Sequence, residues 1–175
     1  LIEAKTGKTW EAYVKEALLK PLEMNSTSVT FNEFLASDNH ATPHVKNKPE
    51  APINYNNAAG AVGVNSNIFD LSNWVSMWLN EGKFNATQVL KPQTVRELMQ
   101  AQTQQTVSSR NEAAGTHLKA AASGWMVSDY KGYKRVEHSG GLPGFILNIA
   151  LIPEKKLGVI VLTNGETLIP FSTTN

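Results

Sequence analysis

The feature that most constrains the fold of this chain is a change in hydrophobic period near residue 123. Before that point apolar residues recur at helical spacing, and after it short runs rich in β-branched residues alternate with turn residues. Strands are predicted at residues 124–128, 133–138, 145–152 and 157–163. The last two runs are apolar at nearly every position, which predicts central strands covered on both faces.

The first part of the chain predicts helices separated by loops. Helices are expected from the N-cap Thr9 to Pro21, from the N-cap Ser66 to the terminator Gly82, and from Pro92 onward. Residues 25–65 and 102–122 are polar or rich in small residues and show no sustained period, which indicates loops. Helices followed by an antiparallel meander predict an α+β fold in one domain.

Composition excludes several classes of function. Lys and Arg number 16 against 15 Asp and Glu, so there is no charge excess to attract nucleic acid or an anionic membrane. Cysteine is absent, which removes disulfide frameworks and thiol catalysis. No apolar run approaches the roughly 18 residues of a membrane span. We therefore expect neither a nucleic-acid partner nor a membrane span.

The segment from His138 to Phe145 is the strongest candidate for chemistry. It reads His-Ser-Gly-Gly-Leu-Pro-Gly-Phe and joins two predicted strands. Glycine lets a ligand lie close to the backbone, and histidine offers a donor or acceptor near neutral pH. On residue types alone, a wide hairpin turn with an incidental histidine explains the segment equally well.

Other short motifs carry less information. His40 and His44 have the spacing of a helical metal pair, but Pro43 lies between them and forbids a regular helix. Ser128 and Lys131 fit S-x-x-K, yet the serine ends a predicted strand, so the lysine would not lie one helical turn away. Tyr55-Asn56-Asn57 fits Y-x-N, a pattern of common residues. Asp70 lies in the first turn of its helix, where a carboxylate favours the helix dipole.

Three ordered blocks of the chain resemble the β-lactamase-related serine hydrolases, which include penicillin-binding proteins. The blocks are Thr6-Gly7-Lys8-Thr9-Trp10 with Lys20-Pro21-Leu22-Glu23-Met24, then Ala59-Gly60-Ala61-Val62-Gly63 with Asp70-Leu71, and then His138-Ser139-Gly140-Gly141 with Gly158-Val159-Ile160-Val161-Leu162-Thr163-Asn164. The first block departs from the family pattern at Glu23, where glycine is usual. Their order and spacing are more specific than any single block.

The resemblance implies roles for the His138 segment. In this family a serine at a helix start attacks a carbonyl, a nearby lysine and a Y-x-N tyrosine handle its proton, and a strand with K-T-G or H-x-G forms the opposite wall. His138-Ser139-Gly140 matches that strand. Gly141 would then supply one backbone N–H of the oxyanion hole, with Ser139 and Gly140 contacting substrate. His138 would contact the carboxylate or carbonyl side of the substrate or assist the proton network.

The family order also bears on the nucleophile. Its S-x-x-K and Y-x-N elements precede the first block, whereas the first serine of this chain, Ser26, follows that block. We therefore expect the rear part of a β-lactamase/transpeptidase-like domain, incomplete at the N-terminus and without the nucleophile. Within residues 1–175 the expected parts are a first helix and Pro-Leu-Glu-Met segment at 1–24, a helical and loop region at 25–122, and an antiparallel sheet at 123–164.

The expected activity follows from the resemblance. The whole enzyme would hydrolyse an ester, peptide or β-lactam bond of a small molecule or peptide through an acyl-serine, with no metal or organic cofactor. This chain alone is predicted to be inactive. The family suggests a periplasmic or secreted protein, and an open sheet edge would favour self-association. A non-catalytic binding or assembly module of the same fold, or a chain that does not fold alone, stay as alternatives.

Overall fold

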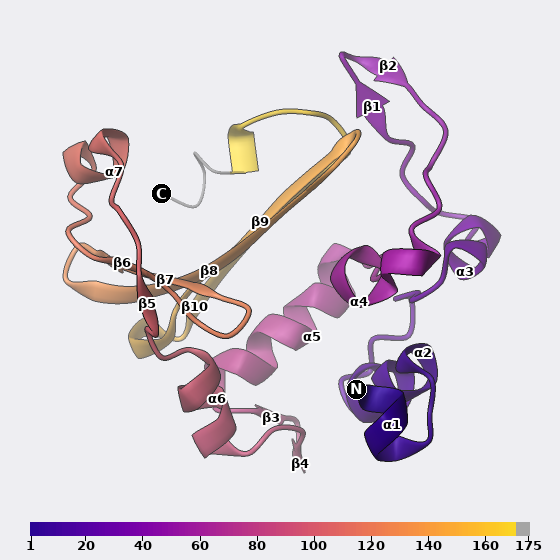
Figure 1. Cartoon of the computed structure of the whole chain (residues 1–175), viewed down its shortest axis with the longest axis horizontal. Coiled ribbons are helices and arrows are strands. Elements are labelled where there is room, and N and C mark those ends of the chain that lie inside the picture. The colour runs from indigo at the N-terminus through magenta and orange to yellow at the C-terminus, as the bar shows by residue number, and fades with distance from the viewer. Residues whose placement is uncertain (171–175) are drawn as a thin grey trace.

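The computed structural model describes residues 1–170, and its centre is a six-stranded antiparallel sheet (Figure 1). The strand order is β10-β9-β8-β7-β6-β5, so each strand pairs with its neighbour in sequence. The strands are β5 (Thr103–Gln104), β6 (Lys119–Ala121), β7 (Met126–Tyr130), β8 (Tyr133–Leu142), β9 (Phe145–Ile152) and β10 (Leu157–Thr163). The predicted α+β fold with an antiparallel meander is confirmed.

The two central hairpins have two-residue turns. Lys131 and Gly132, between β7 and β8, have φ angles of 49° and 83°, as a type I′ turn requires. Pro143 and Gly144, between β8 and β9, place proline before a glycine with φ 78°, the order found in a type II turn. The turn after β8 is therefore narrow. The alternative of a wide glycine-rich turn is wrong, because β8 runs through both glycines to Leu142, and the strand that the family resemblance implied for His138-Ser139-Gly140 is observed.

Two sequence expectations about the sheet are corrected. The strands β5 and β6 lie within residues 102–122, which were expected to form a loop; their Ala-rich and polar sequences carry no alternating pattern. The strand β10 was expected to be central, yet it forms one edge of the sheet described here. Its apolar side chains are explained in part by a helix on one face: a Cβ at Gly158 would lie 2.4 Å from Cγ1 of Val75 in α5.

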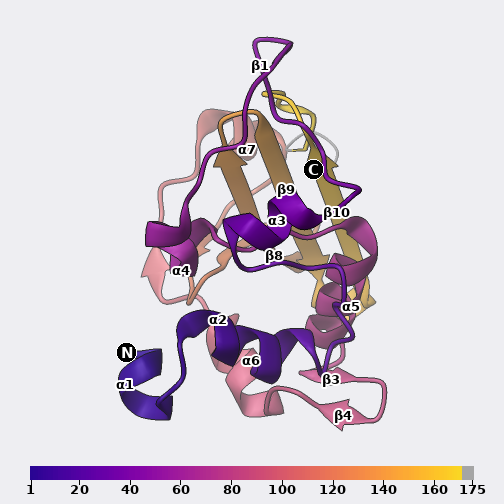
Figure 2. The ribbon, with the colours of Figure 1, turned by 90° about the vertical axis from the view of Figure 1, so that its right-hand side faces the viewer.

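The main helix, α5 (Ile68–Leu79), runs along one face of the sheet (Figures 1 and 2). Asn67 is its N-cap, accepting hydrogen bonds from the N–H groups of Phe69 and Asp70. Ser66 was expected in that role, but its hydroxyl lies 2.7 Å from the hydroxyl of Thr27 instead. The helix ends before the turn that contains Gly82, whose N–H donates to the carbonyl of Met77.

The remaining elements are short. They are α1 (Ile2–Thr6), α2 (Trp10–Val14), the π-helix η1 (Lys15–Leu19), α3 (Phe31–Ala36), the 3₁₀ helix η2 (Asn56–Ala58), α4 (Ala59–Val62), α6 (Pro92–Leu98), α7 (Ser109–Ala113) and the 3₁₀ helix η3 (Pro153–Lys155), with two small hairpins, β1 (His44–Val45) with β2 (Lys48–Pro49) and β3 (Lys83–Phe84) with β4 (Thr87–Gln88). Thr9 caps α2 as predicted. None of the helices in residues 1–170 is long and apolar enough to cross a membrane.

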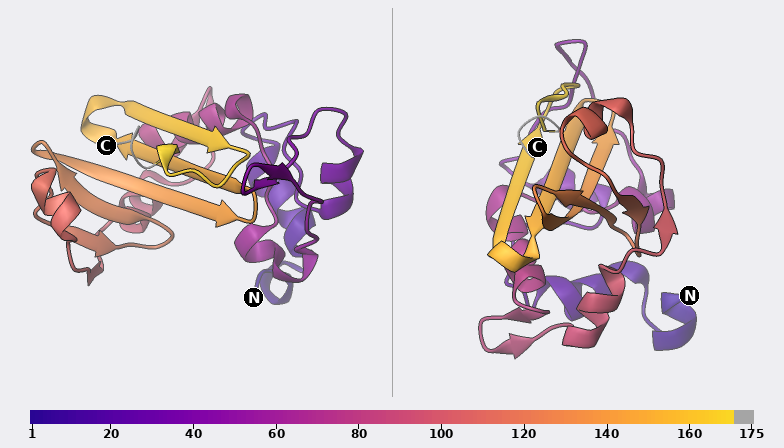
Figure 3. Two further views of the ribbon diagram at one scale, coloured as in Figure 1. Left: turned by 90° about the horizontal axis from the view of Figure 1, so that it is seen from above. Right: turned by 90° about the vertical axis from the view of Figure 1, so that its left-hand side faces the viewer.

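The hydrophobic core joins α5, the sheet, α6 and the N-terminal segment from α2 to Val29. Met77 of α5, Val136 of β8 and Leu151 of β9 are fully buried. On the opposite face of the sheet Arg135 and Asn148 are also buried. Figure 3 shows the long strands β8, β9 and β10 side by side, with β5, β6 and α7 turned away from them.

The backbone conformation at Glu23 explains why glycine is usual at this position of the first family block. Its φ angle is 55°, in the left-handed region that glycine adopts without steric cost. The Glu23 N–H donates to the carbonyl of Lys20, and its carboxylate accepts a hydrogen bond from the side chain of Asn85. The chain therefore keeps the backbone geometry of the block although the residue differs.

Candidate functional site

The end of strand β8 has a backbone edge with no neighbouring strand. The pairing of β7 with β8 reaches only from Tyr130↔Tyr133 to Met126↔Glu137. Strand β8 continues to Leu142 and pairs there with β9 alone. Within residues 1–170, the segment from His138 to Leu142 therefore has a partner strand on one side only.

The turn geometry shows which backbone groups face this open side. A two-residue turn closes on a hydrogen-bonded pair, here Leu142 and Phe145, and such pairs alternate along an antiparallel ladder. His138 and Gly140 therefore bond to β9. Ser139 and Gly141 direct their N–H and C=O groups away from β9, toward the position that β7 has left. This arrangement suits an extended ligand or an acyl oxygen.

The side chains of the segment divide between the two faces of the sheet. His138 shares the α5 face with the buried Val136, and Ser139 lies on the opposite face; both are exposed. The His138 ring packs edge-on to Trp125, with 6.4 Å between ring centroids and an interplanar angle of 87°. Trp125 packs in turn against Trp78 of α5, at 5.1 Å. The imidazole is therefore supported by the core while its other side faces solvent.

The two glycines of the segment differ in what surrounds them. A Cβ at Gly140 would lie 3.3 Å from Cγ of Leu147, a tight contact, whereas a Cβ at Gly141 would meet nothing within 4 Å. Packing against Leu147 therefore favours glycine at position 140, whereas the space around position 141 would accept a larger residue. The turn glycine Gly144 is more constrained, because a Cβ there would lie 2.5 Å from Pro43.

A small cavity begins one residue beyond Gly141. It has a volume of about 50 Å³, and its wall comes from α3, the loop before η2, α4 and the β8–β9 turn. The apolar side chains around it include Phe31, Phe34, Tyr55, Val62, Leu142 and Phe145. Sequence reasoning missed this cavity because most of its wall lies in residues 25–65, where no period predicted an element.

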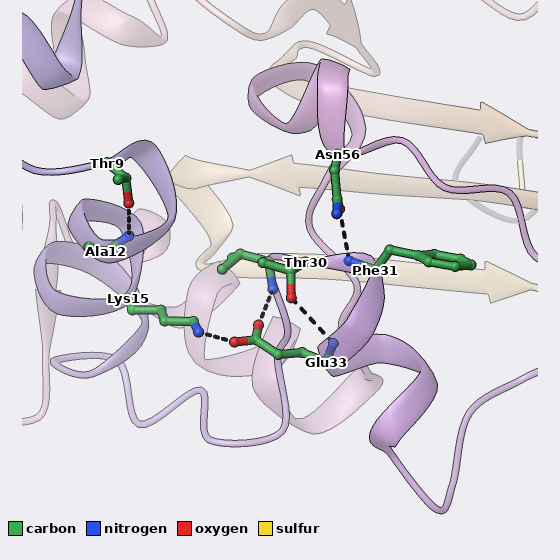
Figure 4. Close-up of polar contacts among 8 residues, drawn as sticks. Thr9, Ala12, Lys15, Thr30, Phe31, Glu33 and Asn56 are labelled. Atoms are coloured by element: carbon green, nitrogen blue, oxygen red, sulfur yellow. Dashed lines mark hydrogen bonds and ion pairs between the residues drawn. The ribbon is translucent and has the colours of Figure 1, made fainter.

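Polar contacts hold α3 in place beside the cavity (Figure 4). Thr30 caps the helix by accepting from the N–H of Glu33, and the Glu33 carboxylate pairs with Lys15 of η1. The side-chain oxygen of Asn56 accepts a hydrogen bond from the N–H of Phe31 at 2.9 Å. The Lys15 ammonium, which donates to the Glu33 carboxylate, holds the pKa of that carboxyl below its ordinary value.

Asp70 connects two segments that are distant in sequence. Its buried carboxylate accepts hydrogen bonds from the N–H of Ser26 at 2.9 Å and from the hydroxyl of Thr27 at 2.7 Å. An isolated antiparallel bridge between Ser28 and Asn65 lies beside it. The dipole explanation offered for Asp70 from sequence therefore omitted its main contacts.

The competing motifs do not form catalytic arrangements. Ser128 lies in β7, is 5% exposed, and accepts a hydrogen bond from Nε of Arg135 at 3.1 Å. Lys131 lies in the following turn, with its ammonium 5.1 Å from the Tyr130 ring centroid. The pair therefore lacks the helical geometry of a serine with its lysine base. Tyr55 precedes η2 and borders the cavity.

The other histidines contact backbone carbonyls separately. Nδ1 of His40 lies 2.7 Å from the carbonyl of Ser37, and Nδ1 of His44 lies 2.9 Å from the carbonyl of Thr42. Across residues 1–170, no three His, Asp or Glu side chains gather as metal ligands would. The backbone N–H of His117 donates to the carboxylate of Asp129, which has a structural role between β6 and β7.

Comparison with known proteins identifies the family. The family profile described as Beta-lactamase matches residues 1–174. The chain belongs to the beta-lactamase family. It is 32% identical to unguisins hydrolase ungD' of Aspergillus campestris (strain IBT 28561), over 95% of this chain and 31% of that protein. It is 27% identical to protein flp of Staphylococcus aureus (strain MRSA252), over 94% of this chain and 30% of that protein.

A solved structure shares the fold. The octameric penicillin-binding protein homologue from Pyrococcus abyssi matches with a TM-score of 0.78 and 23% sequence identity, over 94% of this chain and 36% of that chain. The chain thus spans about a third of the length of these relatives. The sequence resemblance to β-lactamase-related and penicillin-binding-protein-like hydrolases is confirmed. The roles assigned to His138, Ser139, Gly140 and Gly141 stay predictions.

Proposed function

We propose that this chain forms one wall of an acyl-hydrolase site of the beta-lactamase family. The N–H of Gly141 binds the acyl oxygen of an ester, peptide or β-lactam substrate, and the backbone of Ser139 and the face of Gly140 border the bound chain. His138 contacts the carboxylate or carbonyl side of the substrate or assists proton transfer. The observation that carries the proposal is the backbone edge of β8 at Ser139 and Gly141, which has no partner strand among residues 1–170 and lies beside an exposed histidine.

In this proposal the nucleophile of the reaction is not a serine of residues 1–170, the part of the chain that the structure describes. Ser128, the serine of the S-x-x-K pattern, is buried in a strand and accepts a hydrogen bond from Arg135. The side chain of Ser139 lies on the face opposite His138. Neither serine has a lysine one helical turn away, which is the arrangement that would activate it.

The wall is tested by ligand binding to the ¹⁵N-labelled chain. Titration with N-acetylglycine methylamide should shift the amide signals of Ser139 and Gly141, because their N–H groups are open. The amide of Gly140 points to β9 and serves as the internal control, expected to shift least. Equal shifts throughout β8, or shifts confined to another part of the chain, would refute this wall.

The absence of a nucleophile is tested with p-nitrophenyl acetate and a chromogenic cephalosporin. The chain is expected to give no stoichiometric burst and no covalent adduct by mass spectrometry. A burst that is lost on Ser128→Ala would overturn the assignment and would make Ser128 the nucleophile. Binding at Gly141 without turnover in a longer protein that carries S-x-x-K and Y-x-N would favour the non-catalytic module.

A further inference from the structure

The cavity beside the β8–β9 turn has a size that selects among ligands. A cavity of about 150 Å³ accepts a benzene ring, and one of about 10–15 Å³ accepts a single water molecule. The cavity described here, about 50 Å³, lies between these sizes. It is closer in size to a methyl or isopropyl group than to a phenyl ring.

The wall of the cavity indicates an apolar occupant. Two amide side chains border it, and both hold backbone groups: Asn56 accepts from the N–H of Phe31, and Asn65 donates to the carbonyl of Gly63. Phe34 and Phe145 supply aromatic rings, and burial of apolar ligand surface against them is favourable.

The position of the cavity connects it to the open edge of β8. Leu142 borders the cavity and directly follows Gly141. Leu142 and Phe145 lie on the same face of the sheet as His138, which is four residues or roughly 13 Å back along the strand. A ligand whose carbonyl oxygen meets the Gly141 N–H therefore places its next substituent at the cavity mouth.

We infer that this cavity is a specificity pocket for a small aliphatic side chain next to the acyl group. The inference rests on the proposed function, because the Gly141 N–H holds the acyl carbonyl of the ligand and so sets which substituent reaches the pocket. Substrates with a methyl, ethyl or isopropyl group at this position are preferred over those with hydrogen, and those with a benzyl group are rejected. Phe34 sets the upper limit of size.

The test measures binding of a matched ligand series to the chain by NMR titration. The ligands are N-acetyl methylamides of racemic alanine, valine and phenylalanine, with the glycine compound as reference. Each buried methyl or methylene is expected to tighten binding about fourfold. Alanine and valine ligands should therefore bind progressively tighter than glycine, and the phenylalanine ligand should bind more weakly than the valine ligand.

Phe34→Ala should reverse the order of the valine and phenylalanine ligands, because it enlarges the pocket. Leu35→Ala is the matched control: Leu35 lies next in α3, is 47% exposed and does not border the cavity, so the order should stay unchanged. Tyr55→Phe should change affinity less than twofold, because the pocket selects apolar groups; a larger loss would overturn the apolar assignment.

The outcomes separate the two proposals. Ligands that shift Ser139 and Gly141 without any dependence on side-chain size would refute the pocket and leave the β8 wall intact. Failure of every ligand to shift those two amides would refute the wall itself. An unchanged ligand order in Phe34→Ala would also refute the pocket, provided that the circular dichroism spectrum shows a folded chain. Phe34→Leu, a smaller change, serves as a second variant if Phe34→Ala does not fold.

Discussion

The two halves of strand β8 have the same backbone conformation but different surroundings. The half from Tyr133 to Glu137 has strands on both sides and contains the fully buried Val136. The half from His138 to Leu142 has one neighbouring strand within the described residues, and both His138 and Ser139 are exposed. One continuous strand thus has strand neighbours on both sides in its first half and, within residues 1–170, on one side only in its second.

A large contrast is expected from proline substitutions two residues apart. Glu137→Pro removes an N–H that bonds to β7 in a central strand and leaves its acceptor unpaired, which should destabilise the chain by about 1–3 kcal/mol. Ser139→Pro removes only an open N–H and should cost about 1 kcal/mol or less. Urea unfolding measures both, with Glu137→Gln as the control for the lost carboxylate, which lies 3.5 Å from Arg135. Equal costs would mean that the two halves do not differ in pairing.

Alanine substitutions on the α5 face should show a contrast of similar size. Val136→Ala leaves a cavity in the core and should cost about 2–3 kcal/mol, or roughly 4–12 °C in melting temperature. His138→Ala removes one ring contact with Trp125 and should cost about 1 kcal/mol or less. Calorimetry distinguishes them. If His138→Ala cost as much as Val136→Ala, His138 would be a core residue rather than a ligand-facing one.

The glycine pair should show a smaller contrast. Gly141→Ala adds a methyl group into open space and should stabilise the chain by about 0.5 kcal/mol, because alanine loses less conformational entropy on folding. Gly140→Ala should be less stable than Gly141→Ala, because Leu147 has to move. Urea midpoints at matched m-values test this order. The reverse order would show that the surroundings of the two positions differ from those described.

The smallest effect concerns the support of β7 by Asp129. The N–H groups of Leu118 and then His117 donate to its carboxylate and lower its pKa below the ordinary 3.8. A lowered folded pKa means that the charged form contributes stability above pH 3.8, and that this contribution is lost as the pH falls through the lower folded value. Asp129→Asn should therefore flatten the dependence of the urea midpoint on pH below about pH 4. An unchanged dependence would contradict the assigned cause.

The elements that could be predicted from the sequence are those whose residue pattern lies within one short segment. Short apolar and β-branched runs bounded by turn residues predicted β7, β9 and β10, and the Thr9 cap was correct. The residue pattern alone did not predict the extension of β8 through Gly140 and Gly141, because glycine indicates a turn and pairing with β9 keeps the segment extended. The family resemblance did place His138-Ser139-Gly140 on a strand, and β8 confirms that expectation. The cavity was not predicted for a related reason: Phe34, Tyr55 and Phe145 meet through packing between segments that carry no common period.

The contacts of Asp70 with Ser26 and Thr27, and the bridge between Ser28 and Asn65, close residues 28–65 into a loop with fixed ends. The entropy of closing such a loop grows slowly, by about 0.6 kcal/mol for each doubling of its length. Insertions and deletions between the fixed ends are therefore inexpensive for the fold where they avoid Pro43 and His44, which contact the turn at Gly144. Because this loop carries Phe34 and Tyr55, changes in its length can reshape the cavity while the pairing of β8 with β9 is kept.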